Sequence, residues 1–325
     1  MRRFTGSGGS IAGNPATPNY QTLSEAEFER RSDSLWERYA DCDLCAYDCG
    51  VDRTDGRIGA CRVDDTASVS AHFAHFGEED PIRGSHGSGT IFLANCNMTC
   101  VFCQNFETSH EAQGESATPE EIAEMALELQ SKGCHNVNFV SPTHHSPHLV
   151  EAVRIAHERG LDLPIVWNCG GYERPEILEA LEGIVDVYMP DVKWGDDDAA
   201  TRYSKAPNYW TNVRASLREM HRQVGDLEIG ADGLATGGVL VRHLVMPNHV
   251  ESAKRVLSFV AEELSAETYV NVMAQYTPYY KAAREQRYEE IGREVTTEEY
   301  RSVIDHAREI GLERLEFDAR ALESR

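Results

Sequence analysis

Three cysteines close together in the chain are the residues best suited to metal chemistry. Cys96, Cys100 and Cys103 have the spacing C-x3-C-x2-C, directly after an apolar run at residues 90–94 that is typical of a strand. Thiolates bind iron–sulfur clusters, and a [4Fe–4S] cluster needs four ligands. Three thiolates therefore leave one iron free to bind a substrate or cofactor. A zinc loop or buried free thiols are disfavoured, because packing alone does not explain three cysteines at this spacing.

A second group of four cysteines lies nearer the amino terminus and indicates a closed metal site. Its members are Cys42, Cys45, Cys49 and Cys61. Glycines punctuate this segment, which favours an irregular loop over a helix or strand. Four thiolates complete the coordination of either a zinc ion or an iron–sulfur cluster, and the spacing does not distinguish the two. We therefore predict a small Cys-rich metal knuckle, here called the four-Cys knuckle, that holds a second metal.

The length and composition favour a single large α/β domain with a small appendage. The chain has 325 residues, of which 41% are hydrophobic, so it can bury a substantial core. It has no apolar run long enough for a transmembrane helix, and its first residues lack the apolar region of a secretory signal. Seven of the nine cysteines fall in the two groups above, which is typical of metal binding in a reducing compartment. We therefore expect a cytoplasmic protein.

The charge balance is strongly acidic. The formal net charge is −23, from 54 Asp and Glu against 31 Lys and Arg. An acidic surface repels nucleic acid and anionic membranes, so neither is expected as a partner. Such a surface also suits high salt, where screening weakens the self-repulsion, and we therefore expect a halophilic source.

Strands and helices alternate along most of the chain, which implies a parallel sheet. A doubly wound open sheet and a partial barrel both fit this alternation. The expected strands are 90–94, 137–140, 164–168, 185–189, 239–245 and 268–273. The expected helices are 119–131, 147–158, 175–181, 210–223 and 250–264. A further helix at 296–310 and a strand at 315–317 are expected after them.

Polar residues gather at the ends of the expected strands, where functional groups of parallel barrels collect. Asp191 and Lys193 follow the fourth strand, and alternation places both on one face. Arg242, in the fifth strand, can pair with a carboxylate, and its neighbour His243 must face the other way. Cys169, at the end of the third strand, is a candidate hydrogen-atom relay or cluster ligand, although such a cysteine is more often inert.

Around the three-cysteine segment the sequence resembles the radical S-adenosylmethionine (SAM) superfamily. The signature of that superfamily is C-x3-C-x-aromatic-C, and Phe102 is the aromatic residue here. The flanks, Gly-Ser-Gly-Thr-Ile-Phe-Leu at 87–93 and Gln-Asn after Cys103, are closer to an uncharacterised branch related to pyruvate formate-lyase-activating enzyme. The resemblance covers about residues 40–320 and implies a partial (β/α)6 barrel. The expected division is a disordered tail at 1–23, a helix and the four-Cys knuckle at 24–85, and the barrel at 86–325.

The resemblance also implies cofactors and their contacts. Cys96, Cys100 and Cys103 would hold a [4Fe–4S] cluster whose open iron is chelated by SAM. The cluster would cleave SAM to a 5′-deoxyadenosyl radical, which abstracts hydrogen from a substrate. The chain lacks the Gly-Gly-Glu motif that receives the SAM amino group in activating enzymes, so Thr143 or His144 is expected to receive it. The candidate catalytic residues are His144 and Cys169. The residues expected to bind SAM are Phe102, Thr143, Asn168, Asp191, Lys193 and Arg242.

The resemblance therefore predicts a radical SAM enzyme, and it implies the type that activates glycyl-radical enzymes. The substrate is either a glycine of a partner protein or a small molecule, and the sequence does not decide between them. An electron donor such as a ferredoxin or flavodoxin is the expected partner. Modification of a cofactor precursor or other small molecule is one alternative, and a two-cluster electron carrier without SAM chemistry is another.

Overall fold

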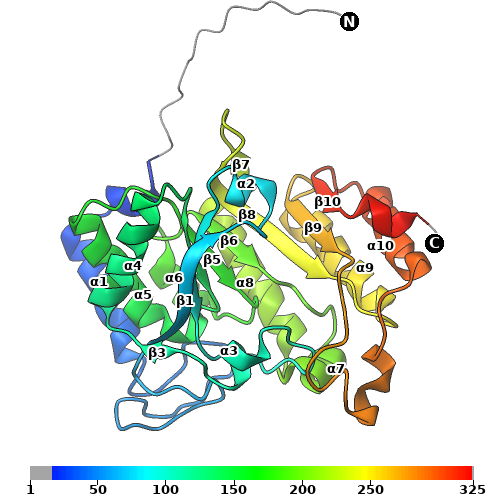
Figure 1. Ribbon diagram of the computed structural model, residues 1–325, viewed down its shortest axis with the longest axis horizontal. Helices are drawn as coiled ribbons and strands as arrows, with labels where there is room; N and C mark the ends of the chain where they lie inside the picture. The colour runs from blue at the N-terminus through cyan, green and yellow to red at the C-terminus, as the bar shows by residue number, and fades with distance from the viewer. Residues whose placement is uncertain (1–16, 324–325) are drawn as a thin grey trace, which may run out of the picture.

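The computed structural model describes residues 17–323, and its centre is one sheet with the strand order β10-β9-β8-β6-β5-β4-β2-β1-β3 (Figure 1). Seven strands from β2 to β10 run parallel along this order. The six expected strands and the parallel α/β sheet are thus confirmed. The parallel strands are β2 (Ser88–Leu93), β4 (Val137–Val140), β5 (Ile165–Cys169), β6 (Val187–Pro190), β8 (Ala235–Leu244), β9 (Tyr269–Met273) and β10 (Leu315–Phe317).

Three further strands pair antiparallel and were not predicted. β1 (Ser68–His75) pairs with β2 and with the short β3 (Glu115–Ser116), and β7 (Glu228–Ile229) pairs with β8. Most side chains of β1 are only half-buried, and β3 and β7 are exposed. β1 lies between β2 and β3 in the sheet, and β3 and β7, with two residues each, are too short for a periodic pattern to mark them in a sequence.

The expected helices connect the parallel strands. A capping box begins α4 at Thr118 and α10 at Thr296, in which the threonine and a glutamate three residues later cap each other's backbone N–H groups. Within residues 17–323, none of the helices combines the length and apolar character needed to cross a membrane. The longer helices are α1 (Glu25–Glu37), α4 (Pro119–Ser131), α5 (Ser146–Glu158), α6 (Pro175–Leu181), α8 (Tyr209–Val224), α9 (Val250–Phe259) and α10 (Thr297–Glu309).

The two faces of the sheet differ in character. The face toward the helices is apolar, with buried side chains such as Phe139, Trp167 and Tyr188. The other face, called the inner face here, carries the polar residues Asn168 and Arg242. A small apolar cluster also lies on this face, where Ile82 of α2 (Asp80–Arg83) packs against Val166, Val187, Met189, Leu227 and Leu240.

Both cysteine groups lie at one end of the molecule. Figure 1 shows the blue loops of the four-Cys knuckle at the same end as α3 (Phe106–His110) and α7 (Asp197–Ala199). The short helix α3 directly follows the three-cysteine segment, and α2 and β7 lie at the opposite end. The carboxyl ends of the parallel strands therefore face the knuckle.

The disorder expected at residues 1–23 falls mostly outside the described residues, but it is wrong for the part that is described. Asn19–Thr22 form a 3-10 helix, and the side chain of Tyr20 is fully buried. Asp186 fixes this segment, because its carboxylate accepts hydrogen bonds from the backbone N–H of Asn19 and of Ile165, both at 2.7 Å. Burial raises the pKa of Asp186 to about 7, against the effect of these two bonds.

The raised pKa of Asp186 predicts how stability depends on pH. The carboxyl group of an unfolded chain titrates near pH ~3.9, so between about pH 4 and pH 7 the folded state holds the proton more tightly. This contribution is fully present below the unfolded pKa and is lost as the pH rises through the folded pKa. We expect the melting temperature of the wild type to fall more steeply from pH 5 to pH 8 than that of Asp186→Asn. Parallel pH profiles of the two proteins would contradict the assignment.

Candidate active site

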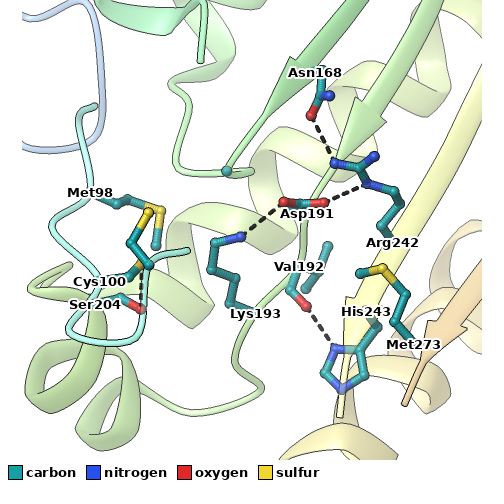
Figure 2. A network of polar contacts seen from close by, with 12 residues as sticks. Met98, Cys100, Asn168, Asp191, Val192, Lys193, Ser204, Arg242, His243 and Met273 are labelled. Atoms are coloured by element: carbon teal, nitrogen blue, oxygen red, sulfur yellow. Dashed lines mark hydrogen bonds and ion pairs between the residues drawn. The ribbon is translucent and has the colours of Figure 1, made fainter. Parts of the chain in front are cut away.

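The three cysteines lie in a loop, residues 95–103, that we call the three-Cys loop. The sulfur of Cys96 accepts a hydrogen bond from the backbone N–H of Met98 at 3.3 Å. The sulfur of Cys100 lies 3.1 Å from the hydroxyl oxygen of Ser204, as Figure 2 shows, and that of Cys103 lies 3.1 Å from the hydroxyl of Ser109. Each sulfur therefore has a polar neighbour.

A π-helix after β6 supports the loop from one side. The backbone N–H groups of Thr99 and Val101 donate to the carbonyl oxygens of Ser204 and Tyr203, at 3.2 and 2.8 Å. These two carbonyls belong to the π-helix Ala200–Ser204. π-Helical turns are rare and often occur at functional sites.

The turn after β5 supports the loop from another side. A Cβ atom at Gly170 would lie 2.7 Å from the sulfur of Met98, so the absence of a side chain here lets Met98 pack against the turn. The amide of Asn97 also donates to the carbonyl oxygen of Tyr172 at 3.1 Å. The turn after β5 thus lies directly against the three-Cys loop.

His144 and His145 hold the start of the three-Cys loop. Both imidazoles lie within 3.1–3.2 Å of the carbonyl oxygen of Ala94, the residue at the end of β2. Both are buried, and burial lowers the pKa of His144 to about 3, so its ring is neutral near pH 7. His144, expected as a catalytic residue or SAM ligand, therefore has a visible role in positioning the loop.

A network of charged side chains crosses the inner face beside the loop (Figure 2). Asp191 accepts hydrogen bonds from the side chains of Lys193 at 3.0 Å and of Arg242 at 2.6 Å. Arg242 also donates to the side-chain oxygen of Asn168 at 3.1 Å. Burial disfavours a charged Asp191, but the two cations outweigh it and hold its pKa well below the ordinary value. Four residues predicted to bind the cofactor are thus brought together.

Two glutamates that sequence reasoning missed complete this network. Arg242 donates to the carboxylate of Glu78 at 2.8 Å, and it lies 3.8 Å from that of Glu79. Glu79 in turn accepts a hydrogen bond from Asn271 at 2.7 Å. Both glutamates are buried and precede α2, where no strand or helix periodicity marks them.

Two other residues of the expected site do not join this network. Thr143 donates to the buried carboxylate of Glu173 at 2.6 Å. Cys169 follows Asn168 in β5, so alternation directs it to the helix side, where it is buried and lies near Glu173. Burial raises the pKa of its thiol well above the ordinary value, as expected for an unreactive cysteine.

Phe102 and His243 also lie away from the network. The ring of Phe102 packs edge-on against those of Trp194 and Tyr276, with ring centroids 5.9 Å apart in both pairs. His243 turns away from Arg242, as alternation requires, and bonds to the carbonyl oxygen of Val192 at 2.7 Å (Figure 2). Both side chains are part of the packed interior.

The four-Cys knuckle packs against the supports of the three-Cys loop. The carbonyl oxygen of Tyr172, which accepts from Asn97, also accepts from the backbone N–H of Ala46 at 3.5 Å. Arg53 of the knuckle is 0% exposed and donates to the carbonyl oxygen of His144 at 2.9 Å. One glycine is needed here, because a Cβ atom at Gly59 would lie 2.9 Å from the sulfur of Cys49.

The donor set of the three-Cys loop suits an iron–sulfur cluster. Burial raises the pKa of Cys96 to about 11 and that of Cys100 to about 12, and the nearby positive charge of Lys193 opposes both rises. A cation beside clustered thiols favours their thiolate forms, which are the forms that bind iron. Among residues 17–323, no three His, Cys, Asp or Glu side chains are arranged to hold a single metal ion. The second metal at the knuckle therefore stays a prediction.

The sequence and the fold are similar to those of known proteins. Residues 90–251 match the family described as the Radical SAM superfamily. The uncharacterized protein MJ0674 of Methanocaldococcus jannaschii is 34% identical over 284 residues, which cover 85% of this chain and 76% of that protein. The uncharacterized protein MJ0808 of the same organism is 27% identical over 279 residues, or 80% of this chain and 76% of that protein. The structure of the FeFe-hydrogenase maturase HydG from Carboxydothermus hydrogenoformans aligns with a TM-score of 0.50 at 10% identity, over 70% of this chain and 52% of HydG. At this identity the similarity is one of fold alone.

Proposed function

The chain belongs to the radical SAM superfamily, and from this we propose an enzyme of the type that activates glycyl-radical enzymes. Membership implies an iron–sulfur cluster and cleavage of SAM. One observation carries the assignment of the active site. Lys193 lies close to Cys100, and Asp191 holds its ammonium group on the inner face. The finer assignment to activating enzymes is supported by the flanks of the three-Cys loop, at 87–93 and after Cys103.

We assign the [4Fe–4S] cluster to Cys96, Cys100 and Cys103. When bound together with SAM, this cluster supplies the electron that cleaves SAM to methionine and a 5′-deoxyadenosyl radical. The contribution of the chain is to hold the loop rigid, to bind SAM and to exclude water from the radical. The electron comes from a one-electron donor, for which we propose a ferredoxin or flavodoxin.

The inner face offers groups of the right charge for SAM. The ammonium of Lys193 suits the SAM carboxylate, and the carboxylate of Asp191 suits the ribose hydroxyls. Arg242 already donates to Asp191, Glu78 and Asn168, so we propose that it positions Asp191 rather than binding SAM itself.

One alternative is supported by the shared carbonyl of Tyr172, which joins the two cysteine groups. A two-cluster electron carrier would use such a contact and would not need SAM.

The test is to reduce the iron-loaded protein with dithionite in the presence of SAM and to measure 5′-deoxyadenosine. Its formation supports the enzyme, and its absence supports the carrier. A glycyl radical detected by electron paramagnetic resonance (EPR) on a partner protein would establish the activating role. Consumption of a small molecule would instead establish radical modification of that molecule.

Replacing Cys100 should abolish SAM cleavage without unfolding the chain. The cluster needs all three thiolates, whereas the sheet and its helices do not depend on the loop. We expect Cys100→Ala to keep the circular dichroism spectrum of the wild type and to form no 5′-deoxyadenosine. Cys134→Ala, a buried cysteine outside both groups, is the matched control and should keep the activity. Cleavage of SAM by Cys100→Ala would remove the central claim.

Replacing Asp191 should weaken SAM binding more than it slows the chemical step. A charge-assisted hydrogen bond contributes about 1.5–3 kcal/mol, so its loss should reduce SAM affinity by about ten- to a hundredfold. Titration of SAM into iron-loaded Asp191→Ala and wild type measures this change. Glu78→Gln is the control, since Glu78 contacts Arg242 but not Asp191 or Lys193, and it should bind SAM almost as well as the wild type. Equal affinities of Asp191→Ala and wild type would rule out the contact.

Replacing Cys45 should lower metal content and stability at the knuckle. We propose that the metal there is structural, and structural metals contribute directly to the free energy of folding. Cys45→Ala should melt at a lower temperature than Cys134→Ala and bind less metal, but should keep the spectral change of the first cluster on addition of SAM. An unchanged metal content would argue against the knuckle as a metal site.

A further inference from the structure

The hydroxyl group of Ser204 lies within hydrogen-bond distance of both the indole N–H of Trp194 and the sulfur of Cys100. Ser204 is 0% exposed, and its oxygen accepts a hydrogen bond from the indole N–H of Trp194 at 2.8 Å. An indole N–H can only donate, so the oxygen of Ser204 is the acceptor in this pair. The hydroxyl hydrogen remains for another partner, and the sulfur of Cys100 lies 3.1 Å away (Figure 2).

The protonation state of Cys100 fixes the direction of this bond. A thiol can donate to the serine oxygen, but a thiolate that ligates iron has no hydrogen. In the iron-bound protein Ser204 is therefore the donor and the sulfur is the acceptor. The backbone also holds Ser204 against the loop, since its carbonyl oxygen accepts from the N–H of Thr99 at 3.2 Å.

Ser109 provides a contrast at a second cysteine of the same loop. Its hydroxyl oxygen lies 3.1 Å from the sulfur of Cys103, the same distance as in the Ser204 pair. It also donates to the carbonyl oxygen of Asn105 at 2.8 Å and lies 2.7 Å from a ring nitrogen of His110. The carbonyl oxygen of Asn105 therefore competes with the sulfur of Cys103 for the one hydroxyl hydrogen of Ser109.

We propose that Ser204, oriented by Trp194, raises the reduction potential of the iron–sulfur cluster through its hydrogen bond to Cys100. This inference rests on the proposed function, because it assumes a cluster on the three-Cys loop. Reduction adds one electron, taken from an external reductant, and increases the negative charge on the cysteine sulfurs. A hydrogen-bond donor to sulfur stabilises that added charge, and such bonds are among the factors that set cluster potentials. Ser204 and Trp194 are thus positioning residues that make the first electron transfer easier.

The test is an EPR-monitored redox titration of the iron-loaded protein without SAM. We expect Ser204→Ala to lower the equilibrium constant for one-electron reduction by about tenfold, which corresponds to a midpoint about 59 mV lower. Ser109→Ala, the matched control, should change the constant by less than about twofold, because its hydrogen is shared. An unchanged midpoint in fully loaded Ser204→Ala would overturn the proposal, and so would equal shifts in the two variants.

Trp194→Phe tests the same claim without touching Ser204 or a cysteine. It removes the indole donor that orients the hydroxyl, so the midpoint should fall, by less than in Ser204→Ala. This variant decides the question if Ser204→Ala does not bind iron, and an unchanged midpoint in it would overturn the proposal. Failure of both variants to bind iron would also count against it, since the pair would then be purely structural.

The titration is independent of SAM cleavage. Wild type that binds iron but forms no 5′-deoxyadenosine would refute the proposed enzyme while leaving the effect of Ser204 measurable.

Discussion

The arrangement of the inner face depends on the ion pairs that the carboxylate of Asp191 forms with Lys193 and Arg242. The side chain of Asp191 is 26% exposed, so its carboxylate is partly removed from water. Nearby opposite charges offset the free-energy cost of that partial burial. Arg242 and Lys193 supply them, and Glu78 balances Arg242 from the other side. Burial raises the pKa of Glu79, which favours its neutral form. The network joins the segment after β6 and the strand β8 to the segment before α2.

The sequence predicted those parts of the site that depend on local pattern. Asp191 and Lys193 are two residues apart, and the structure places both on the inner face, as the strand period requires. The same rule separates Asn168 from Cys169 and could have excluded that cysteine from the inner face. The elements were predictable for a similar reason, because buried parallel strands are short apolar runs and helices such as α4 begin at recognisable caps.

The parts that were missed depend on contacts between distant segments. Glu78 and Arg242 are 164 residues apart, and nothing around Glu78 marks it as part of a site. Ser204 lies in a π-helix, which has no simple signature in a sequence. His144 was predicted as a catalytic residue or as a group that receives the SAM amino group. Its burial, which makes it a positioning residue, depends on the packing of Arg53 and Ala94 around it. Packing of this kind is decided by the tertiary structure, which one sequence does not reveal.

The four-Cys knuckle is structurally continuous with the supports of the three-Cys loop. One path of hydrogen bonds runs from Arg53 to the backbone of His144, whose ring meets the carbonyl of Ala94 at the start of the loop. Another runs from Ala46 through the carbonyl of Tyr172 to Asn97 inside the loop. A disturbance at the knuckle can therefore reach the three-Cys loop through this chain of hydrogen bonds.

The distance along the chain between Cys100 and Ser204 has a consequence for how the protein is made. The two residues are 104 positions apart, so the ribosome completes the cysteines well before the π-helix that surrounds them. A nascent chain that ends before residue 200 presents Cys100 without the hydroxyl of Ser204, and Thr99 and Val101 without their backbone acceptors. Iron delivered during synthesis would meet a loop that lacks its π-helix contacts, whereas iron delivered after release would meet a loop that has them. The order of translation and metal insertion therefore determines whether iron meets Cys100 before or after Ser204 is in place.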